Sequence, residues 1–106
     1  MAQDVSPDLT LEAVAQAICA NADDIRQRGV TAVFVYGSRS RGDHRHDSDL
    51  DVFVEYDPNS QFNLLKLARV RLLIEKATGL DVHITTANSI PAASMTSIAG
   101  DAVKVL

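Results

Sequence analysis

Two short groups of residues near the middle of the chain could do chemistry together. The first is a Gly-Ser turn, Gly37-Ser38, which follows an apolar segment. Glycine adopts backbone angles closed to other residues, so the amide N–H groups of such a turn can converge on an anion. Ser38 adds a hydroxyl and, if it begins a helical turn, the positive end of that turn. A Gly-Ser turn alone is weak evidence, because most turns of this kind are only turns.

The second group is a pair of aspartates, Asp49 and Asp51, and ten residues lie between Ser38 and Asp49. Residues two apart on a strand project from the same face, so both carboxylates would lie close together. Like charges in that position repel unless they are exposed, share a proton or bind a cation. Oxygen ligands favour Mg²⁺, with Mn²⁺ as the alternative. The pair therefore predicts a metal site, whereas an isolated Asp-any-Asp would be interpreted as solvated.

A third carboxylate, Asp81, is flanked by Leu80 and Val82 in an alternating segment. A charge among residues that favour burial is costly unless it is paired or metal-bound. Asp81 is therefore the candidate for a third acidic ligand beside the pair, and a solvated charge on an edge strand is the alternative.

Strands and a turn must position these residues, and the hydrophobic pattern predicts both. The β-branched and aromatic residues of 31–36 predict a buried strand that ends at the turn. In 49–56, Leu50, Val52 and Val54 alternate with the residues that face the other way, including both aspartates. Further segments predict a helix from Leu11 to Ile25 capped by Thr10 and stopped by Gly29, a helical turn within 40–44, a helix capped by Ser60 that runs to Thr78 and ends at Gly79, a strand at 80–85, a helical turn started by Pro91, and a strand at 102–106.

The predicted helix ending at Thr78 carries apolar residues on both of its sides. One stripe contains Leu64, Leu65, Ala68 and Leu72, and Phe62, Val70, Leu73 and Ala77 form the other. A helix that is apolar on both sides is usually buried on both. One side must cover the sheet, so the other meets a second chain or is covered by the N- and C-terminal segments.

Length and composition limit the class of protein. With 106 residues we expect a single domain, 1–106, in which 1–9 form a loose lead-in. A net charge of −4 and a pI near 5.1 argue against direct nucleic-acid binding. Cys19 is the only cysteine, which favours a reducing, cytoplasmic location. No apolar stretch approaches the roughly 18 residues of a transmembrane helix, so no membrane association is expected.

The complete pattern, Gly-Ser, ten residues, Asp-any-Asp, resembles the signature of the DNA polymerase beta-type nucleotidyltransferases. The resemblance implies an α/β (α+β) fold, a small mixed β-sheet with helices packed on one face and the site on the other. It also implies ATP as substrate and metal ligation by catalytic carboxylates, with Asp81 as a ligand and base toward the acceptor hydroxyl. The site residues that the resemblance implies are Asp49, Asp51 and Asp81 for catalysis and metal binding, and Gly37, Ser38 and Arg41 for nucleotide binding.

The remaining polar residues near the motif are ambiguous from sequence. Arg41 matches the second arginine of the family's loop and is implied to contact the triphosphate, with a solvated residue as the alternative. Arg39 is interpreted as solvated, although it could also contact phosphate. Residues 43–47 are interpreted as a solvated loop. His83 shares the predicted face of Asp81 and could line the site, but an exposed histidine without a role is the favoured interpretation.

The small size of the chain makes the resemblance more specific. The chain resembles, over essentially its whole length, the minimal nucleotidyltransferase antitoxins, which pair with a helical HEPN-domain ribonuclease toxin. The resemblance implies transfer of AMP from ATP to a tyrosine of such a toxin, because the chain has no residues left for an acceptor-binding domain. A second copy of the chain could also help to position the acceptor, so a homo-oligomer is possible. Two alternatives stay open, a catalytically silent module that neutralises a toxin by contact and a nucleotidyltransferase acting on a small molecule.

Overall fold

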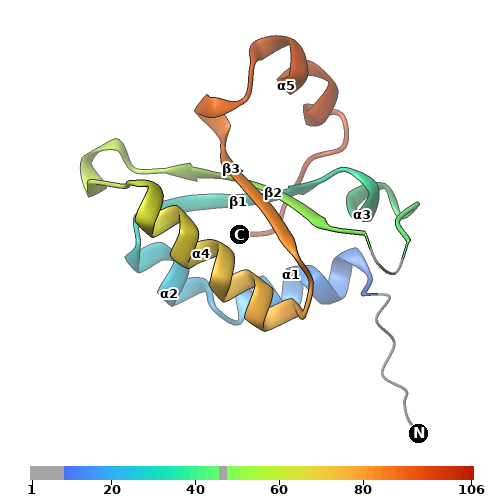
Figure 1. Ribbon diagram of the computed structural model, residues 1–106, viewed down its shortest axis with the longest axis horizontal. Coiled ribbons are helices and arrows are strands. Elements are labelled where there is room, and N and C mark those ends of the chain that lie inside the picture. The colour runs from blue at the N-terminus through green and yellow to red at the C-terminus, as the bar shows by residue number, and fades with distance from the viewer. Residues whose placement is uncertain (1–8, 46–47) are drawn as a thin grey trace, which may run out of the picture.

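A mixed β-sheet with helices around it makes up the part of the chain that the computed structural model describes, residues 9–45 and 48–106 (Figure 1). Of the predicted lead-in 1–9, only Leu9 lies within these ranges. The predicted α/β architecture is confirmed. The helices are α1 (Leu11–Cys19), α2 (Ala22–Gln27), α3 (Ser38–Arg41), α4 (Leu64–Thr78) and α5 (Ala92–Ala99), the strands are β1 (Val30–Tyr36), β2 (Leu50–Tyr56), β3 (Val82–Thr86) and β4 (Val103–Lys104), and 3-10 turns lie at Pro58–Ser60 and Ala87–Ser89.

The described strands form one sheet in the order β3-β2-β1-β4. β1 pairs antiparallel with both β2 and β4, whereas β2 pairs parallel with β3, so the sheet is mixed as predicted. The register sets Asp51 of β2 opposite Tyr36 of β1 and beside His83 of β3. The C-terminal end of β1 and the N-terminal ends of β2 and β3 therefore meet at one end of the sheet.

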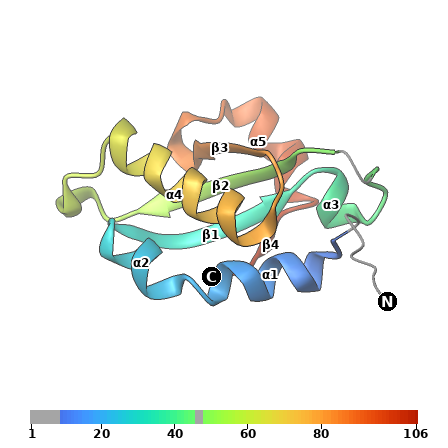
Figure 2. The ribbon, with the colours of Figure 1, turned by 60° about the horizontal axis from the view of Figure 1, so that its bottom comes forward.

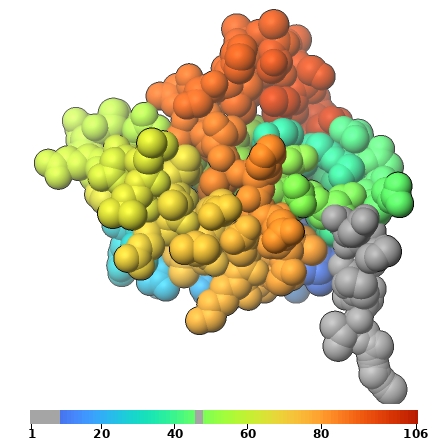
Figure 3. All heavy atoms as spheres, in the orientation of Figure 1, coloured from blue at the N-terminus to red at the C-terminus, as the bar shows by residue number. Residues whose placement is uncertain are grey.

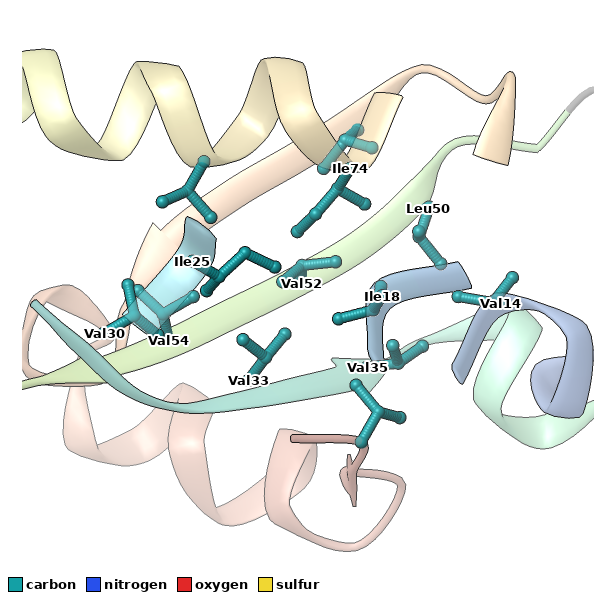
Figure 4. Close-up of a cluster of buried hydrophobic side chains, with 13 residues drawn as sticks. Val14, Ile18, Ile25, Val30, Val33, Val35, Leu50, Val52, Val54 and Ile74 are labelled. Carbon is teal, nitrogen blue, oxygen red and sulfur yellow. The ribbon is translucent and has the colours of Figure 1, made fainter. Parts of the chain in front are cut away.

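The hydrophobic core lies between the sheet and the helices on one of its faces (Figure 4). Leu50, Val52 and Val54 of β2 are completely buried there, as their alternation predicted. Because side chains alternate along a strand, Asp51 must project from the opposite face. The other members of the core cluster are Val14, Ile18, Ile25, Val30, Val33, Val35, Val70, Ile74, Val82 and Val105.

Helices α1, α2 and α4 contribute the helical side of this core. Val14 and Ile18 come from α1, Ile25 from α2, and Val70 and Ile74 from α4. Helix α5 lies across the sheet from α1 and α2 in both ribbon views (Figures 1 and 2). Helices α1, α2 and α4 therefore pack on one face of the mixed sheet, as the predicted fold implied, whereas α5 lies outside that layer. None of the helices in residues 9–45 and 48–106 has the length and apolar character needed to span a bilayer.

The N-terminal helix is interrupted, which differs from the prediction of one helix from Leu11 to Ile25. Thr10 caps it as predicted, accepting a hydrogen bond from Ala13 N at 3.1 Å. Asn21 then leaves the helical region, with φ −109° and ψ 18°, and its amide donates to Ala17 O at 3.0 Å. Asparagine side chains compete for backbone groups in this way, which favours a break over a continuous helix. Gly29, at φ 98°, follows the second helix as the predicted stop.

Helix α4 begins later than predicted and ends where predicted. Ser60 belongs to a 3-10 turn and donates to Asp57 O, while Asn63 caps α4 by accepting from Lys66 N at 2.9 Å. An Asn and a Ser are comparable caps, so composition alone does not separate the two positions. Gly79 ends the helix with a positive φ of 74° and donates to Glu75 O.

Two further segments refine the predictions. The helical turn expected within 40–44 is α3, which begins at Ser38, the second residue of the Gly-Ser turn, and ends before Gly42. The helical turn started by Pro91 is confirmed and continues to Ala99 as α5. The predicted strand at 102–106 is present only as the two residues of β4.

Candidate active site

The Gly-Ser turn joins β1 directly to α3. Gly37 has φ 76° and ψ −152°, a conformation that is essentially restricted to glycine. Its carbonyl accepts from Arg41 N at 3.1 Å, which closes the single turn of α3. Gly42 ends that turn in the left-handed region, and the amides of Gly42 and Asp43 donate to Ser38 O. Both Gly37 and Gly42 therefore have a positive φ angle, which other residue types adopt rarely.

Asp51 lies against this turn. A Cβ atom added to Gly37 would stand 2.5 Å from Oδ2 of Asp51, so a side chain at this position would displace that carboxylate oxygen. Glycine at 37 therefore serves both the backbone angle and the close approach of the carboxylate. The Gly37-Ser38 turn and Asp51, a predicted metal ligand on β2, are therefore in direct contact, as the spacing of the motif predicted.

The Asp51 carboxylate is in an environment that disfavours its charge. Burial raises the pKa of Asp51 above the ordinary value. The nearby His83 and Arg41 lower this pKa, whereas the charge of Asp49 raises it further. Nδ1 of His83 lies 3.8 Å from Oδ1 of Asp51. Tyr36, opposite Asp51 across the ladder, has its pKa raised by burial and then by the charge of Asp51. Such a carboxylate gains from a positive partner.

Asp49 and Asp81 each precede a strand at the same end of the sheet. Leu50 N donates to Asp81 O at 2.9 Å, and Leu50 pairs with Val82, so the two aspartates lie on neighbouring segments of the chain. Both side chains are exposed. Within residues 9–45 and 48–106, however, no group of three or more His, Cys, Asp or Glu side chains is gathered closely enough to hold one ion. The third carboxylate is thus adjacent in backbone but is not part of a formed cluster.

Arg41 lies at the end of α3 and is engaged on the surface. Its Nε contacts Asp43 Oδ2 at 3.0 Å and its Nη1 contacts Asp101 Oδ2 at 2.8 Å. Ser40, also on α3, donates to the backbone carbonyl of Asp101. Exposed ion pairs are weak because water screens them, so an incoming phosphate could replace these carboxylates. The positive charge of Arg41 reaches Asp51, whose charged form it favours.

Two residues have a different place from the one the sequence suggested. Arg39, interpreted as solvated, is only 1% exposed and donates to the carbonyls of Leu9 and Ser48, so that interpretation is wrong. These two partners are backbone carbonyls, which no sequence pattern reveals. His83 is exposed as favoured, yet it also borders Asp51, as the alternative held. Its place two residues after Asp81 on the same strand face was the available signal.

The residues present fit a hard divalent cation. The donors offered by β2 are carboxylate oxygens, the ligand type of Mg²⁺ and Mn²⁺ rather than of zinc or copper. Burial of Asp51 and the charge of Asp49 both disfavour the ionised form of Asp51, and a bound cation would offset both effects. An anion held at the Gly37-Ser38 turn would then lie next to that cation, as phosphoryl transfer requires.

A strand-to-helix turn beside one carboxylate, with a second carboxylate near enough to act on the charge of the first, is an arrangement typical of phosphoryl- and nucleotidyl-transfer sites. The chain belongs to the nucleotidyltransferase domain family, whose model matches residues 18–105. It is therefore a nucleotidyltransferase, and within the family it groups with the minimal nucleotidyltransferases.

Relatives and solved structures support that grouping. The chain is 32% identical to protein adenylyltransferase MntA of Thermococcus cleftensis over 83 residues, 77% of this chain and 82% of the relative. It is also 32% identical over 80 residues, 76% of this chain and 84% of the relative, to a protein of Methanocaldococcus jannaschii named for the same activity. A solved minimal nucleotidyltransferase matches with a TM-score of 0.76 at 28% identity, covering 90% of this chain and 95% of that one.

A more distant structure shares the fold. A chain of the complex between the tri-AMPylated HEPN toxin and the MNT antitoxin of Shewanella oneidensis matches with a TM-score of 0.60 at 13% identity. The match covers 87% of this chain and 71% of that chain. At this identity the comparison shows the architecture alone.

Proposed function

We propose that this protein is a metal-dependent adenylyltransferase that transfers AMP from ATP to a hydroxyl, a tyrosine in the first instance, of a HEPN-type toxin in the cytoplasm. The observation that carries the proposal is the contact between the Gly37-Ser38 turn and Asp51, with Asp49 two residues away. The relatives named for protein adenylyl transfer support the choice of group and acceptor. Residues 1–106 would act as a single domain.

Each proposed role follows from the position of the residue. Asp49 and Asp51 would hold Mg²⁺, or Mn²⁺, which when bound neutralises triphosphate charge. The backbone of Gly37 and Ser38 and the guanidinium of Arg41 would hold the phosphate oxygens. The acceptor oxygen attacks the α-phosphorus, the bond to the β-phosphate oxygen breaks, and pyrophosphate leaves. Asp81, exposed beside β2, would complete the metal site and take the proton of the acceptor hydroxyl.

In this proposal the acceptor is brought by another molecule, and α1, α2 and α4 of the described chain serve to build the core. The outer side of α4 offers a surface for such a contact (Figure 3). Leu64, Leu65 and Leu72 are 82%, 68% and 52% exposed, so the terminal segments that are described do not cover this stripe. That a second chain meets it, either the toxin or a second copy of this protein, stays a prediction.

The proposed function is tested by weighing the acceptor. The purified protein is incubated with Mg-ATP and a HEPN-type protein from the same genome, and the HEPN protein is measured by intact mass spectrometry. We expect a gain of one or more AMP units, lost in Asp49→Ala and Asp51→Ala while both variants remain folded. A collapsed fold in Asp51→Ala would instead assign that carboxylate a structural role.

Other outcomes separate the alternatives. A tight complex without a mass change, unaffected by both substitutions, would identify a silent module that acts by contact. Modification of a free aminoglycoside but not of the HEPN protein would identify a small-molecule nucleotidyltransferase. Either result would overturn the proposed adenylyl transfer to a protein.

A further inference from the structure

Arg39 is the most unexpected residue of the motif because it is a completely buried charge. It is 1% exposed and is among the largest fully buried side chains in the described part of the chain. Arginine is almost never fully buried unless it is paired or hydrogen-bonded. A guanidinium kept in such a place must therefore make interactions that the fold or the site depends on.

The guanidinium joins segments that are far apart in the sequence. Its Nη1 donates to Leu9 O at 3.0 Å, and its Nη2 and Nε reach Ser48 O at 3.1 and 3.4 Å. Leu9 directly precedes Thr10, the cap of α1, and Ser48 directly precedes Asp49. The planar fork of arginine can hold two carbonyls at fixed angles, which a lysine ammonium does less well.

Ser48 is held from a second direction as well. Its N–H donates to Arg45 O at 3.0 Å, and its Oγ accepts from Arg45 N at 2.9 Å. Arg39, on the buried side, donates a hydrogen bond to the carbonyl of the same residue. The entry to β2 is therefore fixed by bonds to both the main-chain carbonyl and the amide of one residue.

The two carboxylates of the motif depend differently on this anchor. Asp51 lies inside β2, where ladder pairing with Tyr36 and His83 holds its backbone. Asp49 precedes the strand and lies directly after the anchored Ser48. Holding Ser48 in place therefore also holds the backbone of Asp49 in place. Because Arg39 lies on α3, directly after Ser38, its bond to Ser48 also sets the distance between Asp49 and the Gly37-Ser38 turn.

We propose that Arg39 is a positioning residue, which sets Asp49 in register with the Gly37-Ser38 turn by holding the carbonyl of Ser48. It touches neither metal nor nucleotide in this role. The inference rests on the proposed function, because it assigns Asp49 to a metal site. Partners that orient metal ligands in this way typically matter by roughly 10–100-fold in metal affinity or activity.

The test measures Mn²⁺ binding in the presence of a non-hydrolysable ATP analogue, by electron paramagnetic resonance, so that no acceptor protein is needed. We expect Arg39→Met to bind Mn²⁺ roughly 10–100-fold more weakly than the unmodified chain. Arg39→Lys keeps the buried charge without the fork, and we expect an intermediate loss. If Arg39→Met does not fold, the Arg39→Lys result decides alone.

A core variant separates positioning from general stability. Ile25→Val removes one buried methylene group from α2, where Ile25 lies beside Val30 and Val54 at the end of the sheet opposite Ser48 (Figure 4), and we expect it to lower the melting temperature. Measured well below its melting temperature, it should bind Mn²⁺ like the unmodified chain. Mn²⁺ binding by the Arg39 variants equal to that of the unmodified chain, or an equal loss of binding in Ile25→Val, would overturn the positioning role. No Mn²⁺ binding by the unmodified chain would overturn the proposed function, and this inference with it.

Discussion

Replacing Gly37 with alanine tests the contact on which the candidate site is built. The position has φ 76° and ψ −152°, and an alanine there would cost about 1–3 kcal/mol of backbone strain. For a domain of this size that corresponds to a melting temperature lower by roughly 4–24 °C. The new Cβ would also stand 2.5 Å from Asp51 Oδ2, so the carboxylate must rotate away.

Rotation of one carboxylate needs little energy, but it moves an oxygen that we propose binds metal. A displacement of about 1 Å at a reacting site can reduce the rate by roughly 10²-fold. We therefore expect Gly37→Ala to fold, to melt earlier, and to transfer AMP at least about 10²-fold more slowly per folded molecule. The assay is AMP incorporation into the HEPN protein by intact mass, at a temperature well below the melting point.

Gly79→Ala is the matched control. Gly79 also has a positive φ, 74°, at the end of α4, but an added Cβ would meet nothing within 4 Å. Its left-handed backbone would cost about 1–2 kcal/mol, so it should melt earlier as well. We expect it to keep full transfer activity. Full activity in Gly37→Ala, or an equal loss in Gly79→Ala, would refute the reasoning that connects the turn to the position of Asp51.

Further outcomes follow from single contacts. Burial raises the pKa of Asp51, so the folded chain binds the proton of this carboxyl more tightly than the unfolded chain does. The stability of the fold therefore falls as pH rises through the folded pKa. With a chelator present, Asp51→Asn should melt at a higher temperature than the unmodified chain at pH 7 but not at pH 3. Added Mg²⁺ should stabilise the unmodified chain more than Asp51→Asn, by thermal shift. Asn63→Ala should remove about 1 kcal/mol of stability in urea unfolding by deleting the cap of α4, while Ser60→Ala should cost less. Leu65→Ser should leave the melting temperature within a few degrees and weaken any complex with the HEPN protein measured by calorimetry, since Leu65 is 68% exposed. An unchanged complex would exclude this side of α4 as the contact surface.

The sequence was sufficient where the cause of a structure is local. Alternation places Leu50, Val52 and Val54 in the core and turns Asp51 away from it, because successive strand residues point to opposite faces. Gly79 ends α4 because glycine tolerates a positive φ, and the motif spacing brings the turn and Asp51 together. These features depend on residue type and on neighbours a few positions away.

Only the tertiary structure decided the rest, because the causes lie between distant segments. Arg39 donates hydrogen bonds to the backbone carbonyls of Leu9 and Ser48. Every residue has a backbone carbonyl, so no pattern of residue types predicts these two hydrogen bonds. The break at Asn21 depends on which backbone group its amide reaches. The neighbours of Asp51, including His83, come from strand register, which sets its electrostatics. Residue types gave this protein its chemistry, and the pairing of remote backbones decides how that chemistry is aligned.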